Sequence, residues 1–83
     1  MRKFTFVWTK RARSTPAVAC AFDGWKLHDM VQDGDSKSYR LELDIPTGEQ
    51  PYKYSVDGEM KTDFGGQIGV DDEGNICNLA PAE

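Results

Sequence analysis

Hydrophobic side chains occupy every second position in three stretches of the chain, at residues 4–8, 39–45 and 52–56, with mostly polar side chains between them. This period of two is typical of β-strands that bury one face against a core. Residues 17–22 alternate larger hydrophobic side chains with alanines, which indicates a strand with little room on its second face. A last short strand is expected at residues 75–79. Since no segment of ten or more residues shows the 3.6-residue period of a helix, we predict an all-β chain.

Turn-forming residues separate the predicted strands at intervals close to those of a β-sandwich. Asp-Gly occurs at 23–24, 33–34 and 57–58. The last of these predicts a tight hairpin whose returning strand is residues 59–62. Residues 64–75 carry four glycines among acidic residues and are predicted to form the longest irregular loop, a kind of segment that is often functional.

The chain has 83 residues, of which 39% are hydrophobic and 29% charged. This size and composition predict one globular domain over residues 1–83, with its core in 4–79. Residues 80–83 are interpreted as a tail or linker stub, which suggests a module cut from a longer protein. No run approaches the roughly 20 apolar residues that cross a membrane, and no signal peptide is evident. We therefore expect a soluble, cytoplasmic domain without a membrane partner.

Charge and cysteine content narrow the possible partners. A formal net charge of −4 disfavours nucleic acid as a partner, although residues 1–14 are basic and residues 57–83 are mainly acidic. We interpret these charges as solvated surface in preference to a partner-binding patch. Cys20 and Cys77 lie in apolar stretches and are expected to be free, buried thiols. Two cysteines and one histidine, widely spaced, do not make a zinc site, so no metal or cofactor is expected.

The sequence gives little support to an enzymatic function. The single histidine, His28, has no nucleophile motif beside it, and no phosphate-binding glycine loop or metal-ligand cluster occurs. His28 is expected to be a surface loop residue. Pairs of acidic residues are plentiful, but a solvated β surface also contains them. We expect a protein that is not an enzyme.

Trp25 and Lys53 are the residues with the clearest potential for binding. Trp25 follows a strand and an Asp-Gly turn, where a large ring left partly exposed could stack on the apolar face of a sugar. Lys53 has the non-core parity of its strand, so its ammonium could donate to a sugar hydroxyl. In the alternative interpretation, Trp25 covers the edge of the sandwich and Lys53 is an ordinary solvated residue. Trp8 continues the parity of Phe4 and Phe6 and is expected in the core.

Several motifs, in order and on compatible strands, carry a family resemblance. They are Phe6-Val7-Trp8, the segment 17–25 ending in Phe22-Asp23-Gly24-Trp25, the segment 46–58 with Tyr52-Lys53-Tyr54 and Val56-Asp57-Gly58, and the closing segment 74–79. Over residues 4–79 the chain resembles carbohydrate-binding module family 48, above all the glycogen-binding domain of the AMP-activated protein kinase β subunit. The resemblance implies an early-set immunoglobulin-like β-sandwich that binds α-1,4-linked glucan such as glycogen or starch, without catalysis or metal. Kinase subunits, or another protein bound through the rest of the parent chain, are further partners that it implies.

The resemblance also implies roles for particular residues. The family's stacking tryptophan corresponds to Trp25, and its sugar-binding lysine corresponds to Lys53. A second stacking tryptophan corresponds to Met60, which offers area but no flat face. In the late loop of the family, a threonine corresponds to Asn75, and the second of two sugar-binding asparagines corresponds to Asn78. The candidate carbohydrate-binding residues are Trp25, Lys53, Met60, Asn75 and Asn78.

The departures from the family pattern leave two hypotheses open. In the late loop, a leucine of the family corresponds to Glu73, a threonine to Asn75, and the first of two asparagines to Cys77. Phe64 stands after Asp63, where the family has a proline, and could replace the missing aromatic ring. The first hypothesis is an α-glucan-binding module with a weakened or altered site. The second is a degenerate module that has lost sugar binding and acts as a protein-interaction or scaffold domain.

Overall fold

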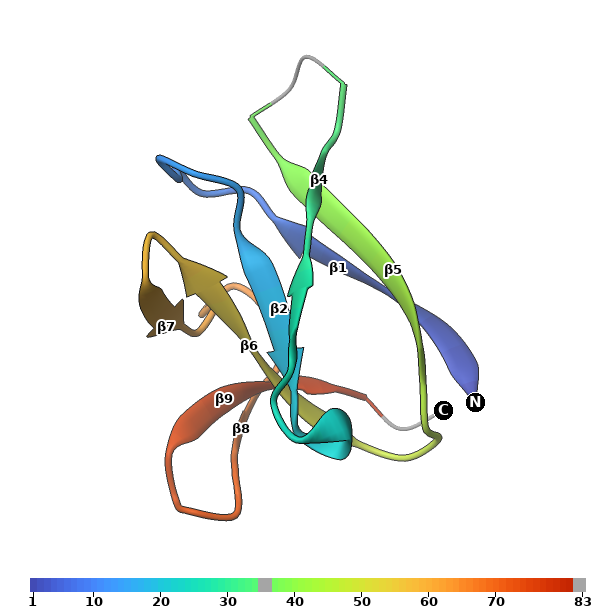
Figure 1. Ribbon diagram of the computed structural model, residues 1–83. Coiled ribbons are helices and arrows are strands. Elements are labelled where there is room, and N and C mark those ends of the chain that lie inside the picture. The colour runs from blue at the N-terminus through green and yellow to red at the C-terminus, as the bar shows by residue number, and fades with distance from the viewer. Residues whose placement is uncertain (35–36, 82–83) are drawn as a thin grey trace.

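The computed structural model describes residues 1–34 and 37–81, which form nine β-strands and one short 3₁₀ turn, η1 (Figure 1). The elements, in chain order, are β1 (Arg2–Trp8), β2 (Ala17–Cys20), η1 (Ala21–Asp23), β3 (Leu27–Asp29), β4 (Val31–Gln32), β5 (Tyr39–Ile45), β6 (Gln50–Val56), β7 (Glu59–Lys61), β8 (Ile68–Val70) and β9 (Ile76–Ala80). The all-β prediction is confirmed.

The strands form two antiparallel sheets, as expected for an immunoglobulin-like sandwich. The smaller sheet has the order β1-β5-β4, and Figure 1 shows β1 and β5 running side by side along their whole length. The larger sheet has the order β3-β2-β6-β9-β8, with β7 also paired to β6. The Arg2 guanidinium donates to the carbonyls of Gly48 and Pro81, so the described ends of the chain lie close together.

The core lies between the two sheets and is built by the residues that the alternation marks. Phe6 and Trp8 of β1 face Tyr52, Tyr54 and Val56 of β6, and all five are buried. The rings contact one another edge-on or tilted, with centroids 4.8 Å apart for Phe6–Tyr52 and 4.9 Å apart for Trp8–Tyr54. Because the Tyr54 hydroxyl also donates to the Val7 carbonyl at 3.0 Å, the two sheets are joined by a hydrogen bond as well as by packing.

Several boundaries differ from the sequence prediction. The segment 64–75 is not one irregular loop, because Ile68–Val70 pairs with β9 as strand β8. The last strand extends to Ala80, which is fully buried, so Ala80 belongs to the core and not to a tail; residues 82–83 lie outside the described residues. The segment 17–22 ends as a strand at Cys20, and the chain then turns through η1. The predicted Asp-Gly turn at 33–34 adjoins residues 35–36, which also lie outside the described residues.

The two cysteines are free and buried, as the sequence predicts. Burial, with a smaller contribution from the nearby Asp23 carboxylate, raises the pKa of Cys20 to about 12. Among residues 1–34 and 37–81, no three His, Cys, Asp or Glu side chains come together as a metal site. In the same part of the chain, no helix has the length and apolar character needed to cross a membrane.

Candidate functional site

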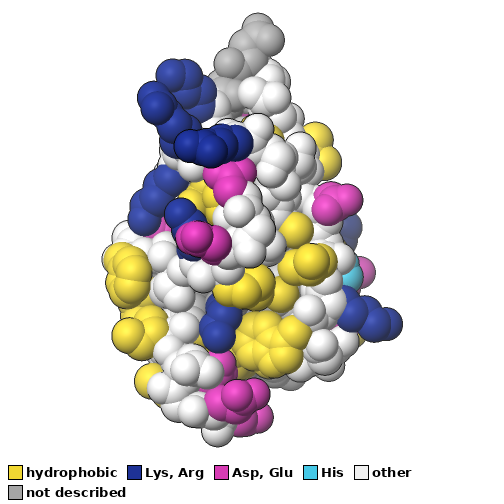
Figure 2. All heavy atoms as spheres, turned by 60° about the vertical axis from the view of Figure 1, so that its left-hand side comes forward, with side chains coloured by type: hydrophobic (Ala, Val, Ile, Leu, Met, Phe, Trp, Pro, Cys, Tyr) yellow, Lys and Arg dark blue, Asp and Glu magenta, His cyan; other side chains and the backbone are white. Residues whose placement is uncertain are grey.

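The residues with odd numbers in β6 point away from the core and define an outer sheet face on the larger sheet. Lys53 pairs in register with Ala19 of β2, and Ser55 pairs with Met60 of β7. Paired residues of an antiparallel sheet project to the same side, so Lys53, Ser55 and Met60 share this face. Figure 2 shows this side of the molecule, with hydrophobic side chains near its middle, several cations with acidic groups among them in the upper part, and a further group of acidic side chains at the bottom.

Trp25 reaches the outer sheet face from a strained turn. After η1, Gly24 has φ 79° and Trp25 itself has φ 65°, and the Trp25 N–H donates to the Cys20 carbonyl at 2.9 Å. A left-handed backbone at a residue other than glycine costs about 1–3 kcal/mol and persists where its surroundings hold it in place. The Trp25 ring is only partly exposed. The sequence left open whether the ring is exposed or covers the edge of the sandwich, and the structure places it between these two extremes.

A contact between Asp23 and His28 stabilises this turn. Asp23 Oδ2 lies 2.6 Å from His28 Nε2, and Asp23 Oδ1 accepts the Lys26 N–H at 3.3 Å. These contacts join Asp23, which precedes Trp25, to Lys26 and to His28 of β3, which follow it. The expectation that His28 is a plain surface loop residue is wrong, because His28 lies in β3, is partly buried and bonds to Asp23.

Lys53 lies directly beside the Trp25 ring, with its ammonium nitrogen 5.3 Å from the ring centroid. The same ammonium donates to Asp71 Oδ2 at 3.1 Å, and 18% of the Lys53 side chain and 9% of the Asp71 side chain are exposed. One of the three ammonium donors is thus committed to Asp71, and the cation also stands against the aromatic ring. Sequence reasoning placed Lys53 on this face but missed its acidic partner.

Asp71 organises the loop between β8 and β9. Its Oδ1 accepts the N–H groups of Glu73 at 3.0 Å and Asn75 at 2.9 Å. The Asn75 N–H, followed by the Lys53 ammonium, lowers the pKa of the Asp71 carboxyl, so Asp71 is a carboxylate at neutral pH. An Asp that bonds backbone N–H groups a few residues ahead is typical of a turn. The sequence therefore indicates a turn at residues 71–75, but it does not indicate the contact of Asp71 with Lys53.

A small hollow of about 150 Å³ lies between the Trp25 turn and this loop. It is lined by Ala21, Trp25, Pro51 and the acidic residues Asp71, Asp72 and Glu73. The exposed side chain of Asn75 belongs to the same loop. The structure therefore brings Trp25, Lys53 and the loop that carries Asn75 together at one end of the outer sheet face.

Met60 lies further along the same face. It is half exposed, at 50%, and it lines an open groove of about 480 Å³ together with Phe64, which is 69% exposed. Strand spacing places the Cα atoms of Lys53 and Met60 about 8 Å apart, since Met60 is one strand across and two residues along. Phe64, suggested by the sequence as a replacement ring, does lie beside Met60.

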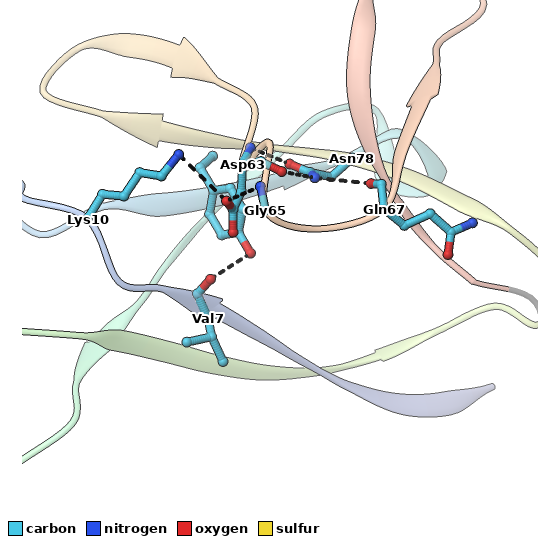
Figure 3. A network of polar contacts seen from close by, with 7 residues as sticks. Val7, Lys10, Asp63, Gly65, Gln67 and Asn78 are labelled. Carbon is cyan, nitrogen blue, oxygen red and sulfur yellow. Dashed lines mark hydrogen bonds and ion pairs between the residues drawn. The ribbon is translucent and has the colours of Figure 1, made fainter.

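Asn78 is not part of this surface, and its assignment as a sugar-binding residue is wrong. Its side chain is fully buried, on the core parity of β9 opposite Tyr52. Its amide oxygen accepts the Asp63 N–H at 2.7 Å, and its amide nitrogen donates to the carbonyls of Asp63 at 2.8 Å and Gln67 at 3.1 Å (Figure 3). The amide holds the chain between β7 and β8 and has no exposed atom to offer to a ligand.

Cys77, which corresponds to a sugar-binding asparagine in the family pattern, is also fully buried. It pairs with Gly69 of β8. Burial, with the Asp71 carboxylate nearby, raises the pKa of the Cys77 thiol, which is therefore neutral at physiological pH. The position supplies no charged or exposed group to the site.

A two-sheet sandwich with an aromatic ring and hydrogen-bonding side chains on one sheet face has the architecture of a carbohydrate-binding module. The family model described as the glycogen recognition site of AMP-activated protein kinase matches residues 2–83. The chain belongs to this family, and the resemblance seen in the sequence is confirmed. No curated protein sequence matches the chain.

Proposed function

We propose that this domain is a non-catalytic α-1,4-glucan-binding module that holds its ligand on the outer sheet face, with Trp25 and Lys53 at the centre of the site. The observation that carries the proposal is the Trp25 ring, held at φ 65° beside the Lys53 ammonium 5.3 Å away. The ring offers a flat apolar surface for a glucose face, and Lys53 retains donors for its hydroxyls. Membership in a glycogen-recognition family supports the same ligand class.

Asn75 and Met60 complete the proposed site. Asn75 is exposed on the loop that Asp71 organises, so its amide can both donate to and accept from sugar hydroxyls. Met60 extends the apolar area along the sheet. Asn78 is left out of the site, because its amide is buried and bonded within the domain.

The proposed roles predict that replacing either Trp25 or Lys53 weakens sugar binding, but for different physical reasons. Trp25→Ala should weaken maltoheptaose binding roughly tenfold or more, and Trp25→Phe should retain part of the affinity because a flat ring remains. Lys53→Ala should weaken binding and also leave Asp71 without its cation. Lys26→Ala is the matched control, since Lys26 is an exposed cation next to Trp25.

Isothermal titration calorimetry with maltoheptaose tests the proposal, with thermal unfolding used to show that each variant is folded. No heat from the wild-type domain at millimolar ligand would refute the proposal and favour the alternative, a degenerate module that binds protein. Binding that is unchanged in Trp25→Ala would move the site away from this face. The parent chain and kinase-subunit partners stay predictions of the family resemblance, and a cytoplasmic location stays a prediction from the sequence.

A further inference from the structure

An open groove of about 480 Å³ lies at the β7 edge of the larger sheet, beside the segment that follows β1. Its lining combines apolar and cationic side chains, namely Trp8, Lys10, Arg11, Met60, Lys61 and Phe64. These residues come from the end of β1, the segment that follows it, and β7 with the segment after it. The basic segment 1–14 thus contributes Lys10 and Arg11 to the groove, and the mainly acidic segment 57–83 contributes Lys61.

The apolar part of the groove suits a sugar ring. Phe64 and Met60 leave 69% and 50% of their surface exposed, which is unusual for two neighbouring large hydrophobic residues. Phe64 supplies the flat face that Met60 lacks. Met60 shares the outer sheet face with Lys53 about 8 Å away, whereas Lys61 pairs with the core residue Tyr54 and projects to the other side of β7. The groove therefore follows the edge of the sheet at β7 and meets the proposed glucan site at Met60.

The cationic part of the groove is weakly paired. Lys10 lies 3.7 Å from Asp63 Oδ1 with 53% of its side chain exposed, and Lys61 lies 4.0 Å from Glu59 with 47% exposed. Exposed pairs at such distances hold their cations loosely. Arg11 is exposed, and no ion pair of Arg11 with an acidic side chain occurs among the described residues. Three cations around an open groove favour an anionic group, and arginine and lysine are the residues that bind phosphate best.

We propose, on the basis of the proposed function above, that the groove is a subsite for a phosphate monoester carried on the glucan chain. The sugar ring bearing the phosphate lies against Phe64 and Met60, and its phosphate oxygens accept hydrogen bonds from Arg11, Lys61 and Lys10. The opposite end of the face is lined by Asp71, Asp72 and Glu73, whose carboxylates repel a phosphate. The glucan is therefore oriented with its phosphorylated unit in the groove and a neutral unit on Trp25.

The test compares maltoheptaose with maltoheptaose that carries a 6-phosphate on one glucose, by titration calorimetry at low and at physiological salt. The wild-type domain should bind the phosphorylated sugar roughly tenfold more tightly at low salt, and added salt should reduce this preference. The double variant Arg11→Gln/Lys61→Gln should lose most of the preference while it still binds the neutral sugar. It leaves Lys10 and its contact with Asp63 in place, so the fold is preserved.

The matched control is Lys3→Gln/Arg40→Gln, which removes one lysine and one arginine from exposed positions on the smaller sheet. It should keep the full preference for the phosphorylated sugar. An equal loss in this control would show that net charge, and not the groove, sets the preference, and would overturn the proposal. Phe64→Ala should weaken the phosphorylated sugar more than the neutral one.

The remaining outcomes separate this proposal from the proposed function. Equal binding of both sugars by the wild-type domain would overturn the phosphate subsite and leave glucan binding intact, whereas binding of neither would refute the proposed function. Inorganic phosphate and a short phosphoserine peptide are further probes. If either competes as well as the phosphorylated sugar, the groove recognises phosphate without glucan and the proposal fails.

Discussion

Replacing Asn78 with alanine tests whether the buried amide is a structural clamp or a sugar ligand. The side chain is fully buried and makes three hydrogen bonds to the segment between β7 and β8 (Figure 3). Asn78→Ala removes all three and takes away the acceptor of the Asp63 N–H, whereas the Asp63 and Gln67 carbonyls still accept the N–H groups of Gly66 and Leu79. Because that segment carries Asp63, whose carboxylate pairs with Lys10, the loss also loosens one rim of the groove.

The size of the effect follows from the hydrogen-bond count. Each intramolecular hydrogen bond contributes about 1 kcal/mol net, so three contribute about 3 kcal/mol to the free energy of unfolding. For a domain of this size, 1 kcal/mol shifts the melting temperature by roughly 4–8 °C, so Asn78→Ala should melt roughly 12–24 °C below the wild type. Asn75→Ala is the control, since the Asn75 side chain is exposed, and its unfolding free energy should stay within about 0.5 kcal/mol of the wild-type value.

Differential scanning calorimetry measures both variants, and maltoheptaose titration is done well below the lower melting temperature. Asn78→Ala should be less stable with sugar affinity little changed, whereas Asn75→Ala should show the reverse. A melting temperature within a few degrees of wild type for Asn78→Ala would contradict the clamp. Loss of sugar affinity at unchanged stability would restore Asn78 as a ligand-binding residue.

Three further predictions concern the core and its surroundings. Tyr54→Phe removes the bond to the Val7 carbonyl and should lower stability by about 1 kcal/mol in urea unfolding, and an unchanged midpoint would speak against that link. The Asp57 carboxylate accepts the Arg13 N–H, which lowers the pKa of Asp57; its stabilisation is therefore present above the unfolded-state pKa and lost as the pH falls through the folded-state pKa. Asp57→Asn should accordingly show a smaller loss of melting temperature than wild type between about pH 5 and pH 2. The Cys20 thiol, with its pKa raised to about 12, should react with iodoacetamide only under denaturing conditions, and rapid labelling of the folded domain would show that β2 opens.

The alternation of hydrophobic residues was sufficient to predict the long strands and their core faces, because a strand that buries one face must repeat every two residues. Strands β3 and β4 have three and two residues, which is too short for a period to be read. Strand β8 lies within a glycine-rich stretch and is defined by its pairing with β9. Such strands depend on a neighbour that the local sequence does not show.

The candidate site was predicted in part for the same reason. The turn residues before Trp25 allow a partly exposed ring, although they do not exclude a ring that covers the sandwich edge, and the parity of Lys53 places its side chain on the outer face of its strand. The contact of Lys53 with Asp71 spans 18 positions of the chain and depends on how β6 lies beside β9. Asn78 has the residue type of a sugar ligand, but its position opposite Tyr52 makes it a core residue, which follows from the register of β6 and β9.

The register also gives the charge asymmetry of the sequence a spatial meaning. Lys10 and Arg11, from the basic N-terminal part, meet Lys61 at the groove, while Asp71, Asp72 and Glu73 lie near Trp25 at the other end of the outer sheet face. This separation of charge has little effect on a neutral glucan. A phosphorylated glucan is oriented by it, because its phosphate is attracted to the cations of the groove and repelled by the carboxylates near Trp25. Lengthening a phosphorylated maltooligosaccharide should therefore increase affinity only on the side of the phosphate that reaches Trp25, and affinity that rises equally for extension in either direction would contradict a single orientation.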